Sequence, residues 1–247
     1  MEDFSKSSSE LWMSRNAAAL EGHLSNYYKW NLEVFPIEKN KRILDLGCGS
    51  GIYLDEIMRY SPACYVGVDY SERNIDQIKK KFIYGTNCSA HCLSLTERWQ
   101  LKALTGSLFD YVLCFDVIEH IENDKEALIG INELMHATKA EFLFLKVPAL
   151  QSIYGKNDEA IGHYRRYSLH GLSKLLTDGS FSIKKIRYQN MLGIFPWYIK
   201  GSLLKRRQAL TCNEGRLFNS LVPIVSAVEK LLSPPIGLSL YSICSVS

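Results

Sequence analysis

Short apolar runs alternate with longer amphipathic segments along most of the chain, and this alternation predicts the fold. The segments between the runs repeat apolar residues at helical spacing, and one of them, 169–176, begins after a capping Ser168 and ends at Gly179. Strands that alternate with helices favour a mostly parallel sheet with helices on both faces. The sequence therefore predicts a doubly wound α/β fold. The runs expected to be strands are 41–46, 64–69, 89–93, 109–115, 141–147 and 181–188.

The two ends of the chain lie outside this alternation. Residues 1–40 hold aromatic residues and leucines at roughly helical spacing before Pro36, which predicts N-terminal lead-in helices that act as a lid. Residues 41–190 are expected to form the core, and 191–247 a C-terminal helical extension. A chain of 247 residues is long enough for one well-buried domain, so we expect all three segments to belong to it.

Composition and charge narrow the classes of protein. A hydrophobic fraction of 47% with 22% charged residues is typical of a globular domain. The net charge of +3 is too small to indicate a nucleic-acid partner. We find no apolar stretch of the length of a signal peptide or spanning helix, and the seven cysteines are scattered, so the expected location is the cytoplasm. The cluster Cys88, His91 and Cys92 lacks a second ligand pair, and no metal site is expected.

Candidate chemistry is concentrated in a glycine-rich loop after the first strand. Gly47, Gly49 and Gly51 allow positive φ and close approach of the backbone to a ligand, and a helix N-terminus follows. Their spacing differs from the dinucleotide fingerprint. Asp45 would repel a pyrophosphate but suits an ammonium group, which S-adenosylmethionine (SAM) carries beside its sulfonium. Asp69, at the end of the second strand, is placed to accept hydrogen bonds from two ribose hydroxyls.

Together with residues 66–72 and 109–124, the segment 43–51 resembles the class I SAM-dependent methyltransferases. The resemblance implies a seven-stranded sheet and SAM as the cofactor. It also implies that Cys48 and its two flanking glycines lie behind the methionine part of SAM, and that Asp69 binds the ribose.

The same resemblance implies further cofactor contacts. Tyr70 would lie along the adenine, and Phe115 and Asp116 would flank the methionine or the transfer site. Many members have an aspartate after the third strand that reaches the adenine amine. Ser94 and Leu95 stand there in this chain, so a backbone amide is expected to make that contact.

A second motif, the run Gly-His-Tyr-Arg-Arg-Tyr at 162–167, follows the fifth strand. It resembles a bacterial subgroup of these enzymes whose substrates are often unassigned. Ligands of such folds gather outside the carboxyl ends of the strands, where His163 and His120 are both expected. Each has an ordinary pKa near neutrality, so we expect His163, and next His120, to be catalytic.

The rest of this run has two interpretations. Tyr164, Arg165, Arg166 and Tyr167 are expected to bind the methyl acceptor. In the alternative, the arginines pair with Asp158 or Glu159 to hold a loop, and the tyrosines only pack.

The acceptor itself is predicted only by class. Enzymes that methylate base amines in nucleic acid usually have an Asn/Asp-Pro-Pro-aromatic motif after the fourth strand, and residues 115–120 do not contain it. We therefore expect a small molecule, a hydroxyl-bearing or glycan-related metabolite, and O-methylation. Two alternatives stay open: a SAM-binding protein without catalysis, and a nicotinamide-dependent oxidoreductase on a similar fold. Turnover to S-adenosylhomocysteine and binding of NAD(P)H, respectively, distinguish them.

The C-terminal region combines aromatic residues, cations and a strongly apolar segment at 217–232, a combination that suits a membrane interface. The alternatives are a helical cap over the sheet and a subunit contact, and the oligomeric state stays open. The aromatic residues and cations are Phe195, Trp197, Tyr198, Lys200, Lys205, Arg206 and Arg207.

Overall fold

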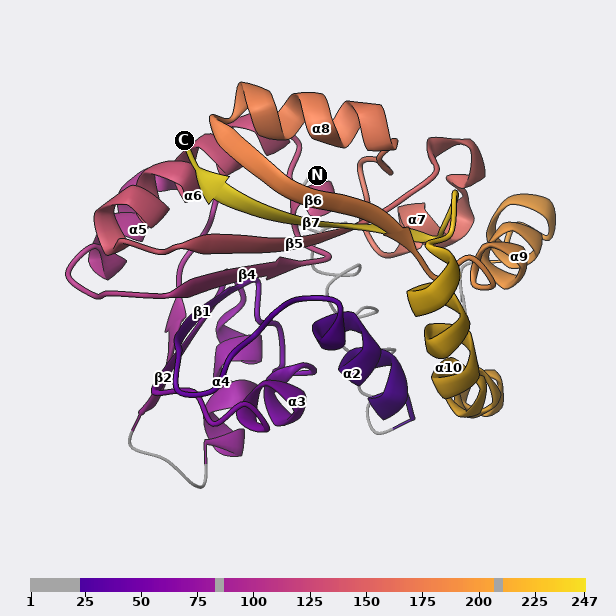
Figure 1. The fold of residues 1–247 in the computed structure, drawn as a ribbon, viewed down its shortest axis with the longest axis horizontal. Coiled ribbons are helices and arrows are strands. Elements are labelled where there is room, and N and C mark those ends of the chain that lie inside the picture. Colours follow the sequence, from indigo (N-terminus) through magenta and orange to yellow (C-terminus); the bar gives the residue numbers. More distant parts are fainter. Residues whose placement is uncertain (1–22, 83–86, 207–210) are drawn as a thin grey trace.

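A computed structural model describes residues 23–82, 87–206 and 211–247, and its centre is one seven-stranded sheet (Figure 1). The strand order is β3-β2-β1-β4-β5-β7-β6. The first five strands are parallel, and β7 runs antiparallel between β5 and β6. The doubly wound, mostly parallel fold is confirmed. The strands are β1 (Arg42–Leu46), β2 (Cys64–Asp69), β3 (Cys88–Cys92), β4 (Tyr111–Phe115), β5 (Phe142–Pro148), β6 (Phe181–Gln189) and β7 (Ser239–Val246).

Helices cover both faces of the sheet (Figure 1). On one face lie α2 (Ser25–Glu33), α3 (Leu54–Met58) and α4 (Glu72–Lys81), and on the other lie α5 (Arg98–Leu101), α6 (Asp124–Thr138) and α8 (Leu169–Asp178). Ser168 caps α8 and Gly179 ends it, as the sequence predicts. The remaining helices near the site and the C-terminus are η2 (Ile118–His120), α7 (Lys156–Ala160), α9 (Ile194–Trp197), η4 (Tyr198–Leu203) and α10 (Cys212–Leu232).

Side-chain alternation along the strands builds one hydrophobic core on each face. In β1, Leu44 and Leu46 enter the core under α6 and α8, whereas Ile43 enters the core under α2, α3 and α4. Period-two alternation turns Asp45 to the same face as Ile43. There its carboxylate accepts a hydrogen bond of 2.8 Å from the hydroxyl of Tyr65.

The structure adds an element at the C-terminus. The sequence analysis treats residues 191–247 as helical, and α10 is there, but β7 follows it and enters the sheet. Leu240 and Cys244 of β7 are fully buried, because the strand lies between two others. A strand with apolar residues on both faces lacks the apolar-polar alternation that would predict it from the sequence. At the N-terminal end, α2 forms one helix of the expected lead-in segment, over residues 25–33. Residues before 23 lie outside the described part of the chain.

Candidate functional site

The glycine loop, residues 47–51, connects β1 to α3. Its glycines have φ values of +74° at Gly47, +54° at Gly49 and +80° at Gly51, which confirms the predicted positive φ. A Cβ added to Gly47 would lie 2.3 Å from a methyl carbon of Val117, and one added to Gly49 would meet nothing within 4 Å. The loop is therefore packed tightly on one side and open on the other, as a cradle for a ligand must be.

Two side chains beneath the loop are buried. Cys48 is only 5% exposed and packs in the core near Tyr65, so it can offer a ligand its backbone but not its thiol. Asp45 is also 5% exposed. Burial raises the pKa of its carboxyl group to about 7, although the hydrogen bond from Tyr65 opposes the shift.

Asp69 joins the end of β2 to the glycine loop. One carboxylate oxygen accepts a hydrogen bond from the backbone amide of Gly49 at 3.0 Å. The other accepts from the amide of Ser71 at 2.9 Å and from the side-chain amide of Asn74 at 3.1 Å. The carboxylate is thus fixed in orientation, and of its roughly four lone-pair sites about one, on the oxygen bonded to Gly49, remains available to a hydroxyl donor such as that of a ribose.

The three residues expected to contact the adenine, Tyr70, Ser94 and Leu95, differ in how exposed they are in the structure. Tyr70 is 57% exposed beside the end of β2, where it can lie along a ring. The amide of Ser94 already donates to the side chain of Gln100 at 2.7 Å. Leu95 is buried in the core under α6. Ser94 is half-buried and its hydroxyl is bonded to that of Thr96 at 2.7 Å, so Tyr70 is the most exposed of these three side chains.

The end of β4 holds a strained aspartate and a buried lysine. Asp116 has φ +55°, and its two carboxylate oxygens lie 2.5 and 2.8 Å from Nζ of Lys146. Lys146 is 2% exposed and reaches this ion pair from within β5. Lys146 is not among the residues expected from the sequence, although it is the single charged residue in the run 142–148, which is a signal for it. Phe115 is buried and stacks on Phe35 at a centroid distance of 5.1 Å, so it supports the site from below.

Both predicted histidines lie at the carboxyl end of the sheet, in a group that we call the histidine cluster: Glu119, His120, Asp158 and His163. Nδ1 of His163 lies 2.9 Å from a carboxylate oxygen of Asp158, and its Nε2 lies 3.7 Å from Oε1 of Glu119. The two imidazole rings are 4.7 Å apart. Burial lowers the pKa of His120 to about 4 and also lowers the pKa of His163, although Asp158 opposes the second shift. Both rings are therefore neutral near pH 7.

The remaining residues of the run after β5 are held by ion pairs. Nη1 of Arg165 lies 2.8 Å from Asp124, whose carboxylate also accepts a hydrogen bond of 2.7 Å from Tyr167. Arg166 is 4% exposed and donates to Asp158 at 2.7 Å. These contacts favour the interpretation in which the side chains hold the loop.

Tyr164 is the exception in this run, because it is 49% exposed. Its backbone amide donates to the carbonyl of Glu119 at 2.8 Å, which holds it near the histidine cluster.

Among the described residues, the set of side chains placed to hold a metal ion is Glu119, His120 and His163. The structure thus gathers a metal-type set where the sequence analysis expects none.

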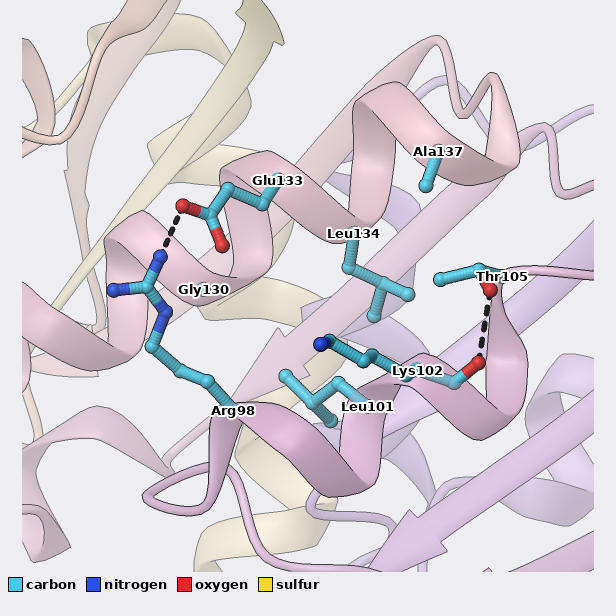
Figure 2. A pocket seen from close by; sticks show the side chains of 8 residues that line it. All are labelled: Arg98, Leu101, Lys102, Thr105, Gly130, Glu133, Leu134 and Ala137. Atoms are coloured by element: carbon cyan, nitrogen blue, oxygen red, sulfur yellow. Dashed lines mark hydrogen bonds and ion pairs between the residues drawn. The ribbon is translucent and has the colours of Figure 1, made fainter.

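A groove of about 480 Å³ lies between α5 and α6 (Figure 2). Its floor is apolar, with Leu101 and Leu134. Arg98 crosses one end and is paired with Glu133. The groove shares no residue with the glycine loop or the histidine cluster, so we do not place the reaction there.

Comparison with known proteins gives the family. The family model described as "Methyltransferase domain" matches residues 20–183, about two thirds of the chain. The chain belongs to this methyltransferase domain family. Curated relatives include the ubiquinone biosynthesis O-methyltransferase of Roseobacter denitrificans, which is 32% identical over 100 residues, 39% of this chain and 38% of the relative. The mitochondrial one of Schizosaccharomyces pombe is 30% identical over 138 residues, 50% of this chain and 46% of the relative. The chain thus spans less than half the length of either relative.

Solved structures agree on the fold. The plantazolicin methyltransferase BamL, in complex with SAH and a substrate analogue, superposes with a TM-score of 0.59 at 15% identity over 98% of this chain and 91% of that one. Magnesium protoporphyrin IX methyltransferase from Synechocystis with bound SAM superposes with a TM-score of 0.52 at 16% identity, over 93% of this chain and 81% of that one. The [4+2]-cyclase SpnF superposes with a TM-score of 0.56 at 12% identity, over 89% of this chain and 80% of that one. Such identities show the fold alone. With the family match, they confirm the expected methyltransferase class and SAM as its cofactor.

Proposed function

We propose that this protein transfers the methyl group of SAM to a hydroxyl group of a small molecule. In that reaction the bond between sulfur and the methyl carbon breaks, and sulfur keeps its electron pair. A bond forms between the methyl carbon and the acceptor oxygen, and the hydroxyl proton leaves. Ubiquinone biosynthesis O-methyltransferases, to which part of the chain is similar, support this class of acceptor. We further propose that the run at 162–167 marks a subgroup with its own acceptor.

The residues of the glycine loop fit SAM. The open side at Gly49 leaves room for the methionine part, and Asp69 offers an acceptor to a ribose hydroxyl. Asp45 supplies negative charge below the loop, which complements the ammonium group of SAM. SAM supplies an activated methyl group, so the protein's own task is to align the acceptor and to receive or release its proton.

The histidine cluster is the observation that carries the acceptor chemistry. Val117 packs against Gly47, so the cluster, which begins two residues later, lies close to the glycine loop. Asp158 accepts a hydrogen bond from Nδ1 of His163, which leaves Nε2 without a proton. We assign Nε2 of His163 as the general base that receives the proton of the acceptor hydroxyl. A general base typically raises the rate by about 10² to 10⁴.

The test starts by incubating the protein with SAM and hydroxyl-bearing metabolites and finding the one that gains about 14 mass units, the mass of an added CH₂. With that acceptor, His163→Ala should lower kcat by about 10² to 10⁴ while SAM affinity stays at the parent value. His170→Ala, at an exposed histidine on α8, is the matched control and should change neither. A loss below about threefold at saturating substrate would make His163 structural and move the assignment to His120. No turnover to S-adenosylhomocysteine with any acceptor would instead favour a SAM-binding protein without catalysis.

A second proposal concerns the C-terminal face, which we assign to an anionic membrane surface. No helix in the described residues is long and apolar enough to cross a membrane. One side of α10 packs Val222 and Val225 against Trp30 of α2. Another side carries an exposed apolar stripe at helical spacing, without a charged residue among its members. The stripe consists of Leu217, Leu221, Ile224, Val228, Leu231 and Leu232, which are 46–84% exposed.

Neighbouring residues extend this stripe and add charge. η4 lies beside α10 at the same end of the molecule (Figure 1), and Lys200 of η4 is paired with Glu214 of α10. Phe195 and Leu203 are 66% and 64% exposed, and Lys205 and Arg206 next to them are exposed. Arg207 lies outside the described residues. Apolar side chains flanked by cations complement the interface of an anionic bilayer.

Sedimentation with vesicles tests this surface. At low salt the protein should sediment with phosphatidylglycerol vesicles and not with phosphatidylcholine vesicles, and Leu231→Asp should abolish the binding. Leu108→Asp, at a leucine that is 48% exposed before β4, should leave it unchanged. If the vesicles fail to sediment the protein, the proposal is wrong. If light scattering instead shows a dimer that Leu231→Asp dissociates, the stripe is a subunit contact.

A further inference from the structure

The histidine cluster contains a carboxylate without a partner. Glu119 is 0% exposed, and neither of its side-chain oxygens has a hydrogen-bond partner in the described structure. Buried carboxyl groups almost always have a hydrogen-bond donor or a cation beside them, because an unsatisfied polar group in the interior is costly. Oε1 lies 3.7 Å from Nε2 of His163, too far for a hydrogen bond. Something that is not part of the chain is therefore expected to lie between them.

The two histidines are oriented as metal ligands. Nδ1 of His120 lies 3.2 Å from the carbonyl oxygen of Gly162, and Nδ1 of His163 lies 2.9 Å from Asp158. Both oxygens can only accept, so each Nδ1 carries the hydrogen, and each Nε2 has a free lone pair. Metal-binding histidines typically donate their second ring nitrogen to a carboxylate or a backbone carbonyl in this way.

The spacing of the three side chains suits one ion. One ligand atom from each of Glu119, His120 and His163 lies within 4.8 Å of the others. Ligand atoms at about 2.0–2.2 Å from a shared ion lie about 3–4 Å apart, so the widest of these separations would have to contract by about 1–2 Å to complete the site.

We propose that Glu119, His120 and His163 bind one divalent first-row transition-metal cation, which holds and acidifies the acceptor hydroxyl. Two imidazoles and one carboxylate favour such ions over Mg²⁺ and Ca²⁺, which prefer oxygen ligands. Three protein ligands leave positions open for the acceptor oxygen. The inference rests on the proposed O-methylation and changes the role of His163, because Nε2 then binds the cation. The hydroxyl loses its proton to solvent because the cation lowers its pKa.

The surroundings of the cluster agree with a cation. Arg166 is paired with Asp158, and Lys146 is paired with Asp116. The positive charges of both side chains are therefore balanced by carboxylates and do not strongly repel a metal ion bound nearby. Asp158 then acts as a positioning residue, because it orients His163 without touching the ion.

Binding of Mn²⁺ and Zn²⁺ to the metal-free full-length protein tests the proposal. Titration followed by the electron paramagnetic resonance signal of free Mn²⁺ should give one bound ion per chain, displaced by Zn²⁺ but not by an equal concentration of Mg²⁺. Glu119→Gln and His120→Ala should each weaken binding by about tenfold or more. His170→Ala should bind as the parent does. Zn²⁺ should also raise the melting temperature of the unmutated protein, a readout that needs no variant to fold.

Two results would overturn the inference: an unmutated protein that binds neither ion, or variants that bind Mn²⁺ as tightly as the parent does. Calorimetry with SAM on the same metal-free samples separates this outcome from failure of the proposed function. If SAM binds and an acceptor is methylated without any bound cation, the O-methylation stands and the metal site is wrong. If SAM does not bind, the proposed function itself is wrong.

Discussion

The glycine loop and the histidine cluster lie side by side, yet they are built in different ways. The loop is held mainly by backbone hydrogen bonds, such as those from the amides of Gly47 and Cys48 to the carbonyl of Val68 at 2.7 and 2.9 Å. The cluster is held by side chains, with Asp158 as its common acceptor. That carboxylate binds His163, Arg166 and the indole nitrogen of Trp197.

This difference determines how each half responds to change. A loop defined by backbone conformation depends on glycines and on the strand that feeds it. A cluster defined by buried ion pairs depends on every partner, because removing one leaves the others charged and unsatisfied. The variants below compare the two halves, beginning with the largest expected effect.

Asp158→Ala should lower the free energy of unfolding by about 3–5 kcal/mol, because it leaves the buried guanidinium of Arg166 without its carboxylate. Glu159→Ala is the matched control in the same short helix. Its carboxylate is half exposed and pairs only with Lys156, so the loss should stay within about 1 kcal/mol. Urea denaturation measures both. If both variants lose the same free energy of unfolding, the ion pairs of the histidine cluster contribute no more to stability than an exposed surface pair does.

On the cofactor side, Asp69→Ala should weaken SAM binding by about 1.5–3 kcal/mol, because a charge-assisted hydrogen bond to the ribose is removed. The carboxylate also holds the amide of Gly49, so the loop loosens in the same variant. Asp76→Ala changes an exposed aspartate on α4 and should leave affinity unchanged. Calorimetry with SAM decides the point, and a folded Asp69→Ala with parental affinity would remove Asp69 from the cofactor site.

Two glycines of the loop allow a finer comparison. Gly47→Ala combines positive φ with a Cβ 2.3 Å from Val117, and overpacking of this kind costs about 1–3 kcal/mol. Gly49→Ala has positive φ but meets no atom within 4 Å, so only the backbone cost of about 1–2 kcal/mol applies. Thermal unfolding without SAM should therefore rank Gly47→Ala as less stable. The opposite order would mean that Val117 moves aside freely.

These contrasts also explain what the sequence predicts. The alternation of apolar runs and amphipathic helices predicts the parallel strands, and glycine spacing predicts positive φ, because both depend on local backbone conformation. Lys146 and β7 escape prediction. The lysine is buried only because Asp116, directly after the neighbouring strand β4, pairs with it, and β7 is a strand only because β5 and β6 enclose it. The roles of Arg165, Arg166 and Tyr167 depend likewise on partners that the linear order does not identify.

The smallest expected effect is a pH dependence of SAM binding through Asp45. Burial raises the pKa of its carboxyl group to about 7, against a weaker opposing effect of the hydrogen bond from Tyr65. The ionised form pairs with the ammonium of SAM, so affinity should fall as the pH drops below 7, by about tenfold per unit well below that value.

Stability without SAM should change in the opposite direction. The folded protein holds the Asp45 proton more tightly than the unfolded chain does, so this contribution is fully present below the ordinary carboxyl pKa and is lost as the pH rises through about 7. Asp45→Asn keeps the shape of the side chain and removes its titration. It should flatten both profiles between pH 5.5 and 7.5, an interval set by that shifted pKa of about 7. If calorimetry at several pH values finds the same slope in the parent and in Asp45→Asn, another group is responsible, and Asp45 does not contact the ammonium.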